Sequence, residues 1–418
     1  FFLHVIIQLI IMKNTPESKT NRIILIMLIG FITAFFWYYL KNSIVPPITD
    51  KVITPFHWPI SIFCDYYSIN NTFNQWGFYG EYNYLTGGIT LLQILKFVSL
   101  GNPYNASKII LLAYFFFSSF YVFKMTKNLS KNIRYLATVV LVFCNYPILF
   151  VVHTANFEGF VLILLIFSYL FYKKNKINIT FILIGVAGAI KIFPLFIWFA
   201  YVKKENFLVS IKYTSLGFFL AFISPFIISL IYYPNGNIID SFWGWAETIS
   251  SGRAMQMYKD TMVVGYNGVF FGHSLLNSIR LIMTPQESIM FSFMTKYYGP
   301  ILFISSFLIL ISSIISLKIK SVLHRYIFIL SALCLFRPTS TDYYLIQFFV
   351  PFIALMVSDS DSKLDWKLLI GIAILFLSKN YYLFYDNNYI TSNTIINSLV
   401  LLFLYLVILI NPINRINR

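Results

Sequence analysis

Long apolar stretches, separated by short polar turns, occupy most of this chain. They lack the alternation of apolar and polar positions that marks half-buried strands, and about 17–22 apolar residues is the length of a helix that crosses a membrane. A shorter apolar segment, 85–100, fits a helix lying at a membrane interface. The pattern predicts apolar helices at roughly 22–40, 107–123, 135–152, 157–172, 179–201, 211–232, 298–317, 323–336, 342–357, 367–383 and 395–411.

The low content of charged residues indicates that lipid, rather than water, surrounds most of the protein. Charged residues make up 11% of the chain and hydrophobic residues 58%, whereas soluble domains carry about 25% charged residues. Because lipid offers no hydrogen bonds to the backbone, such a chain must form helices or a closed barrel. We therefore expect an all-α polytopic membrane protein with a single transmembrane domain at 22–411, a bundle of about ten full spans plus a re-entrant helix pair.

Basic clusters predict which ends face the cytoplasm, since Lys and Arg are enriched in cytoplasmic loops. They occur at 124–134, 173–176 and 318–325. This pattern predicts a cytoplasmic N-terminus (1–21) and tail (412–418). It also predicts two long loops, 41–106 and 233–297, on the outer face of the cell membrane. The net charge of +16 then belongs to cytoplasmic loops rather than to nucleic-acid binding.

The segment 179–201 conflicts with a simple crossing. Basic residues flank both of its ends, and Lys191 and Pro194 lie in its middle. A charge at the centre of a bilayer costs about 2.5–3.5 kcal/mol, and Pro removes a helical hydrogen bond. A re-entrant pair of short helices, broken near Lys191, resolves the conflict; one plain span with a snorkelling Lys is the alternative.

The first outer loop carries a lone carboxylate, Asp65, among aromatic and amide side chains. A proton-abstracting enzyme at a membrane surface needs such a group, although a solvated loop or a helix cap also contains one. Glu81 is the second carboxylate of this loop.

Three segments resemble the GT-C membrane glycosyltransferases, and most of all the polyprenyl-phosphate-mannose-dependent enzymes of glycosyltransferase family 87. They are "CDYY" (64–67) followed by "GFYGEYNYLTGG", the stretch 153–204 with its "K-x-x-P", and "YNGVFFGHSLLNSIR" (266–280), which contains Asn267. The late outer segment "FRPTSTDYY" departs from the family pattern. The resemblance implies an inverting transfer of one sugar from a lipid-phosphate donor to a hydroxyl, with Asp65 as general base and no nucleotide site.

Such a transfer also needs cations at the leaving phosphate and polar groups for the sugar. Arginine binds phosphate bidentately, and an outer arginine equally anchors lipid headgroups. Glu158 could bind a sugar hydroxyl, or its charge could only interact favourably with the dipole of its helix. Lys191 could place a cation beside the substrate cleft, or it could have a structural role that closes the broken helix. The candidate substrate-binding residues are Glu81, Asn156, Glu158, Lys191, Arg253, Asn267, His273, Arg280 and Arg337.

The resemblance therefore implies a membrane hexosyltransferase that moves a mannose-like sugar from a polyprenyl-phosphate donor to a glycolipid or glycan hydroxyl. Its partners are the donor, the acceptor and membrane lipids, with no nucleic acid. No metal-ligand cluster and no Gly-rich phosphate loop can be recognised in the sequence, so we expect no metal and no cofactor. A flippase or transporter, or a polymerase of lipid-linked saccharides, remains the alternative.

Overall fold

A computed structural model describes residues 15–44, 86–232, 272–282, 287–338, 340, 342–359, 362–377, 382–385, 388–391 and 393–411. Within these ranges the chain is almost entirely helical, which confirms the predicted helical class. One short antiparallel strand pair, β1 (Tyr382–Tyr385) with β2 (Asn388–Thr391), precedes the last helix.

The first half of the described chain consists of α-helices and two short 3₁₀ helices, η2 and η3. They are α2 (Pro16–Ile44), α4 (Thr86–Val98), α5 (Pro103–Met125), α6 (Lys131–Phe143), α7 (Tyr146–Thr154), α8 (Glu158–Lys173), α9 (Ile177–Ile190), η2 (Phe193–Ile197), α10 (Trp198–Tyr201), η3 (Lys204–Asn206) and α11 (Phe207–Tyr232).

The second half completes the bundle. Its helices are α15 (Leu275–Ile282), α16 (Glu287–Ser316), α17 (Val322–Phe336), η6 (Asp342–Phe348), α18 (Phe349–Met356), α19 (Lys363–Phe376) and α20 (Asn393–Ile410).

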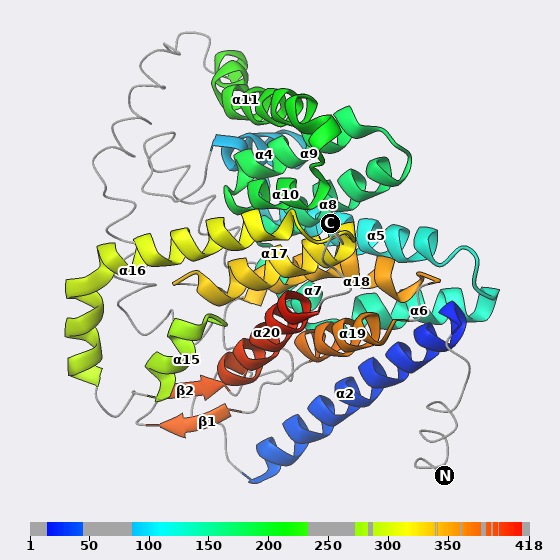
Figure 1. The fold of residues 1–418 in the computed structure, drawn as a ribbon, viewed down its shortest axis with the longest axis vertical. Coiled ribbons are helices and arrows are strands. Elements are labelled where there is room, and N and C mark those ends of the chain that lie inside the picture. The colour runs from blue at the N-terminus through cyan, green and yellow to red at the C-terminus, as the bar shows by residue number, and fades with distance from the viewer. Residues whose placement is uncertain are drawn as a thin grey trace.

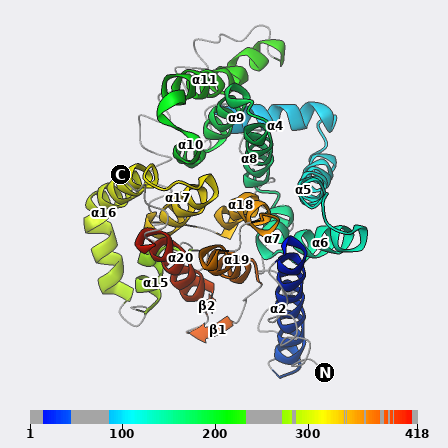
Figure 2. The same ribbon diagram turned by 45° about the vertical axis from the view of Figure 1, so that its right-hand side comes forward.

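The bundle is built around α17 and α18. Figures 1 and 2 both show these two helices in the middle, with α4, α9 and α11 on one side and α2, α19 and α20 on the other. Every residue of α18 is buried. By contrast, α11 exposes large apolar side chains such as Phe219, Leu220 and Ile227. An apolar outer face of this kind is expected where lipid surrounds the protein.

Four described helices are long and apolar enough to cross a membrane: Pro16–Phe36, Pro103–Met125, Lys204–Ile228 and Lys296–Ser316. A fifth span results if α6 and α7, which meet at a bend of 55°, count as one. The expected ten or so full spans are therefore not confirmed. The central helix α17 has 15 residues, or about 22 Å, which is shorter than the roughly 30 Å hydrocarbon core.

In three of the predicted spans, the observed α-helix does not run through the whole span. The segment 135–152 is broken at Asn145, whose side chain caps α7 ahead of Pro147. The segment 342–357 begins as the 3₁₀ helix η6 before α18. The segment 367–383 ends its helix at Phe376 and continues into β1. Apolar content alone does not reveal such breaks, because both sides of each break are apolar.

The predicted outer loops also contain helices. A helix is present within the expected segment 85–100, as α4, and the loop 233–297 holds α15 and the start of α16. The first helix begins at Pro16, ahead of the predicted residue 22, since Pro suits the first turn of a helix.

The predicted break near Lys191 is confirmed. Helix α9 ends at Ile190, and Lys191 has an extended backbone (φ −145°, ψ 134°). The chain then turns back through η2 and α10, so that the ring of Tyr201 lies 4.9 Å from that of Tyr172, just before α9. Both ends of 177–201 therefore lie at the same end of the bundle, and Lys191 is at the tip of the hairpin.

Helix α9 packs closely against α11 at two glycines. A Cβ added to Gly185 would collide with the backbone of Thr214, and one added to Gly217 would collide with the backbone of Ile182. The two backbones can approach this closely because neither glycine has a side chain, a packing mode common between membrane helices.

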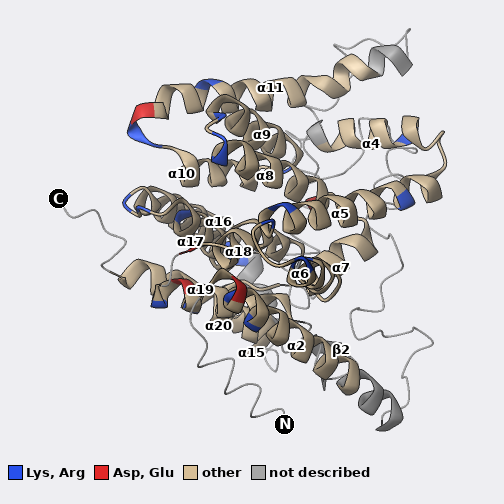
Figure 3. Ribbon diagram, turned by 90° about the vertical axis from the view of Figure 1, so that its right-hand side faces the viewer, with Lys and Arg blue, Asp and Glu red and all other residues tan. Residues whose placement is uncertain are grey.

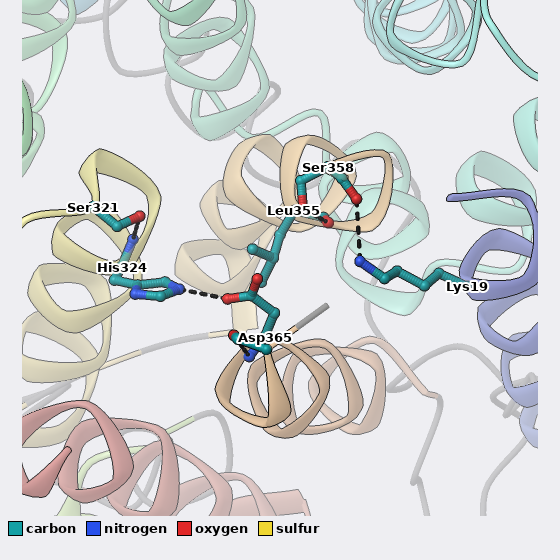
Figure 4. A network of polar contacts seen from close by, with 7 residues as sticks. Lys19, Ser321, His324, Leu355, Ser358 and Asp365 are labelled. Carbon is teal, nitrogen blue, oxygen red and sulfur yellow. Dashed lines mark hydrogen bonds and ion pairs between the residues drawn. The ribbon is translucent and has the colours of Figure 1, made fainter. Parts of the chain in front are cut away.

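Charged residues gather near helix ends, whereas the helix middles are nearly free of them (Figure 3). At one end of the bundle, which we call the basic end, two buried polar contacts join four elements (Figure 4). Lys19 Nζ of α2 donates to the Ser358 carbonyl after α18 at 3.1 Å, and His324 Nε2 of α17 lies 2.6 Å from Asp365 Oδ1 of α19.

Further contacts assign more helix ends to the basic end. Arg325 Nη1 donates to the Val202 carbonyl after α10 at 2.9 Å, and Ser130 Oγ before α6 donates to Glu17 of α2 at 2.9 Å. The Lys and Arg residues at or beside these ends are Lys19, Arg22, Lys124, Lys127, Lys131, Arg134, Lys173, Lys174, Lys176, Lys203, Lys204, Lys318, Lys320, Arg325, Lys363 and Lys367.

Candidate functional site

A buried carboxylate, Glu158, is the centre of the candidate site. It is the first residue of α8, and its side chain is 0% exposed. Oε1 lies 2.8 Å from Nζ of Lys191, and Oε2 accepts a hydrogen bond of 3.1 Å from Nε2 of Gln347. Both carboxylate oxygens therefore have a partner, as an ionised carboxylate in an apolar interior requires.

Asn156 holds the turn that presents Glu158. Ala155 ends α7 in the left-handed conformation (φ 51°). The Asn156 side chain then accepts a 3.0 Å hydrogen bond from the Glu158 backbone N–H and one of 3.2 Å from Lys191 Nζ. The Tyr114 hydroxyl donates to the Asn156 carbonyl at 2.8 Å. This tight turn fixes the carboxylate in the first turn of α8, where the helix dipole also favours a negative charge.

Lys191 reaches this carboxylate because α9 packs back along α8 and ends just before the lysine. It lies at the hairpin tip with its side chain 16% exposed, and its ammonium is 5.7 Å from the ring centroid of Tyr343 and 5.8 Å from that of Tyr344. Cations are attracted to the faces of aromatic rings at such distances. The lysine is thus held by a carboxylate, an amide and two aromatic rings.

Arg337 directly follows the end of α17 and also lies beside Tyr344. Its guanidinium carbon lies 4.7 Å from the Tyr344 ring centroid and 5.9 Å from that of Phe193. Beside it is a small cavity of about 10 Å³. The cavity is lined by Phe193, Leu330, Leu333, Cys334, Arg337, Tyr344 and Gln347. Gln347 therefore joins this cavity to Glu158, and we call the residues Asn156, Glu158, Lys191, Arg337 and Gln347 the Glu158 cluster.

His273 and Arg280 belong to a neighbouring polar cluster, formed by α15, α20 and the segment after Arg337. The His273 backbone N–H donates to the Ser340 carbonyl at 2.6 Å, and Asn397 Nδ2 donates to His273 Nδ1 at 3.2 Å. Arg280 is 6% exposed, near the end of α15. The two clusters thus meet along the segment that runs from Arg337 into η6.

The structure brings together three of the predicted site residues, Asn156, Glu158 and Lys191, in direct contact, with Arg337 next to them. The other four candidates, Asp65, Glu81, Arg253 and Asn267, lie outside the described residues.

Sequence reasoning missed Gln347 and Tyr114. The signal for Gln347 was a single amide in the apolar run of 343–356, where an unpaired polar group is costly. Tyr114 carries no such signal, since tyrosine is frequent in this chain, with 30 residues.

The polar groups of this site are carboxylate, ammonium, guanidinium and amide. In the part of the chain that the structure describes, no three His, Cys, Asp or Glu side chains are grouped so that they could hold a metal ion. Ammonium and guanidinium groups suit anions such as phosphate, and amides suit hydroxyl groups.

Comparison with known proteins adds no relative. No protein-family model, no curated protein and no solved structure matches this chain.

Proposed function

We propose that this chain is a glycosyltransferase of the cell membrane that moves a hexose from a polyprenyl-phosphate donor to a hydroxyl of a glycolipid or glycan. The observation that carries the proposal is the Glu158 cluster, in which a buried ion pair and an amide adjoin an arginine and a cavity. Ionisable groups inside a membrane protein are costly and usually mark a functional site.

In the proposed orientation the basic end faces the cytoplasm, according to the positive-inside rule, and the Glu158 cluster faces the outside. Helix α2 begins at the basic end, and the proposal puts Asp65 on the outer side. Both termini are then cytoplasmic. The shorter buried helices join the four long helices in the membrane-embedded bundle, and the hairpin 177–201 enters the membrane without crossing it.

In the proposed reaction the acceptor hydroxyl attacks the anomeric carbon of the donor sugar from the face opposite the phosphate. The new carbon–oxygen bond forms as the bond to the phosphate oxygen breaks, through an oxocarbenium-like state, and the configuration inverts. Asp65 takes the hydroxyl proton. Lys191 and Arg337 balance the negative charge that develops on the leaving polyprenyl phosphate, and Glu158 holds Lys191 in position.

A transfer assay on the purified full-length protein in lipid nanodiscs tests the proposal, with polyprenyl-phosphate-linked mannose or glucose as donors. We expect Asp65→Asn to lower turnover by about 10²-fold or more, since it retains the size but loses the basicity. The matched control is Asp50→Asn in the same loop, which should leave turnover unchanged. Near-normal turnover in Asp65→Asn would exclude Asp65 as the base.

Transport of a lipid-linked saccharide is the second candidate function. The specific observation in its favour is that buried charge pairs occur at both ends of the bundle, Glu158–Lys191 and His324–Asp365, and such residues line substrate pathways in transporters. Reconstituted vesicles distinguish the two functions: a transporter changes the sidedness of a labelled lipid-linked sugar without forming a new glycosidic bond.

A further inference from the structure

We infer that the cavity beside Gln347 is a subsite that receives one hydroxyl group of the bound glycosyl phosphate and so selects among sugars. This inference rests on the proposed function, because it names a specificity determinant of the same site. It arises from three observations: an amide whose orientation is fixed, an amide oxygen without a partner, and a cavity of limited size.

The orientation of the Gln347 amide follows from its neighbour. Its Nε2 lies 3.1 Å from Oε2 of Glu158. An ionised carboxylate, such as one paired with a lysine, only accepts hydrogen bonds, so the NH₂ group must face it. Oε1 of Gln347 therefore points elsewhere, and it is buried with no hydrogen-bond partner.

An orphaned carbonyl oxygen in an apolar interior is unfavourable unless a ligand or a water supplies a donor. Gln347 itself is 0% exposed and lines the cavity. The other polar side chains of the lining are Arg337, a donor, and Tyr344. A ligand group at this place must donate a hydrogen bond to the Gln347 amide oxygen and accept one from the Arg337 guanidinium. An alcohol hydroxyl can do both.

The size of the cavity sets how much of a ligand can enter. A volume of about 10 Å³ corresponds to about one water-sized group. A sugar ring is too large, whereas one hydroxyl substituent fits. The remaining walls are apolar, with Phe193, Leu330 and Leu333, and offer no other hydrogen bond. We therefore expect recognition of one ring position rather than of the whole sugar.

Wild-type protein with a set of ligands provides the first test, and it needs no variant. The probes are a short-chain polyprenyl-phosphate mannose and its monodeoxy analogues, measured in equilibrium binding and in transfer. We expect one analogue, and only one, to lose about tenfold or more in affinity, because a site built to bind a hydroxyl rejects the ligand that lacks it. Equal binding of all analogues would overturn the subsite, and the cavity would then hold a structural water only.

Two variants test the residues. Cys334→Met adds volume to the cavity wall, so it should weaken binding of the parent sugar by about tenfold and leave the discriminated deoxy analogue unaffected. Gln347→Leu should remove the discrimination between the parent and that analogue. The matched control is Cys144→Met, the same substitution at the half-buried end of α6, which should leave both ligands unaffected.

The failure of this inference differs from the failure of the proposed function. Selective loss of one deoxy analogue in binding, without any sugar transfer, would refute the transferase and retain the subsite. Transfer of all analogues at equal efficiency, with Cys334→Met active on the parent sugar, would refute the subsite and retain the transferase.

Discussion

At the scale of single residues, the ion pair between Glu158 and Lys191 is asymmetric. The side chain of Glu158 is 0% exposed and that of Lys191 is 16% exposed. A charge left without its partner is therefore better solvated on the lysine than on the glutamate. Removing one member of a buried pair costs roughly 3–5 kcal/mol, whereas replacing both members with apolar groups costs much less.

We therefore expect Lys191→Met to lower the free energy of unfolding by about 3 kcal/mol or more, and Glu158→Gln to lower it by less. The double variant should regain most of the stability lost in Lys191→Met while remaining inactive in sugar transfer. Thermal unfolding of the detergent-purified protein measures the stabilities. Additive losses in the double variant would contradict a direct pairing.

At the scale of elements, the close crossing of α9 and α11 depends on its two glycines. In Gly185→Ala the new methyl group would meet the backbone of Thr214, which cannot move aside as a side chain does. We expect the helices to separate, with a loss of about 1–3 kcal/mol, visible as a lower melting temperature. Gly299→Ala in α16 is the matched control, because nothing lies within 4 Å of its added Cβ. A melting temperature of Gly185→Ala equal to that of the control would refute this packing.

Sequence patterns locate most of these helices and some of the breaks between them. Apolar runs reveal α5, α9 and α11, and the basic residues around 179–201 with Lys191 and Pro194 reveal the hairpin. The break before α7 had a signal in Asn145 and Pro147, which form a helix start inside an apolar run.

The sequence predicts less well which side chains of the site contact one another. Opposite charges identify Glu158 and Lys191 as candidates, but their contact requires α9 to pack back along α8 after the turn at 174–176. Gln347 comes from a segment 189 positions beyond Glu158, and no local pattern relates the two. Such contacts depend on tertiary packing, which periodicity does not encode.

At the scale of the whole molecule, the basic end and the Glu158 cluster should lie on opposite sides of the membrane. Helix α5 offers a matched pair of probes, since Asn105 near its start and Asn128 beyond its end are both exposed. In a background without Cys64, Cys144 and Cys334, we expect a membrane-impermeant maleimide added outside intact cells to label Asn105→Cys and not Asn128→Cys. The reverse pattern would invert the proposed orientation.

The tip of the hairpin at Lys191 also constrains how the protein is made. Glu158 and Asn156, which neutralise and bind this lysine, precede it in the chain and leave the ribosome first. In the proposed orientation an unpaired ammonium would enter the bilayer at a cost of about 2.5–3.5 kcal/mol, so we expect α8 to be in place before the hairpin inserts. We therefore expect the order of insertion to follow the order of the sequence, with the Glu158 carboxylate placed first and the hairpin that carries Lys191 packing onto it afterwards.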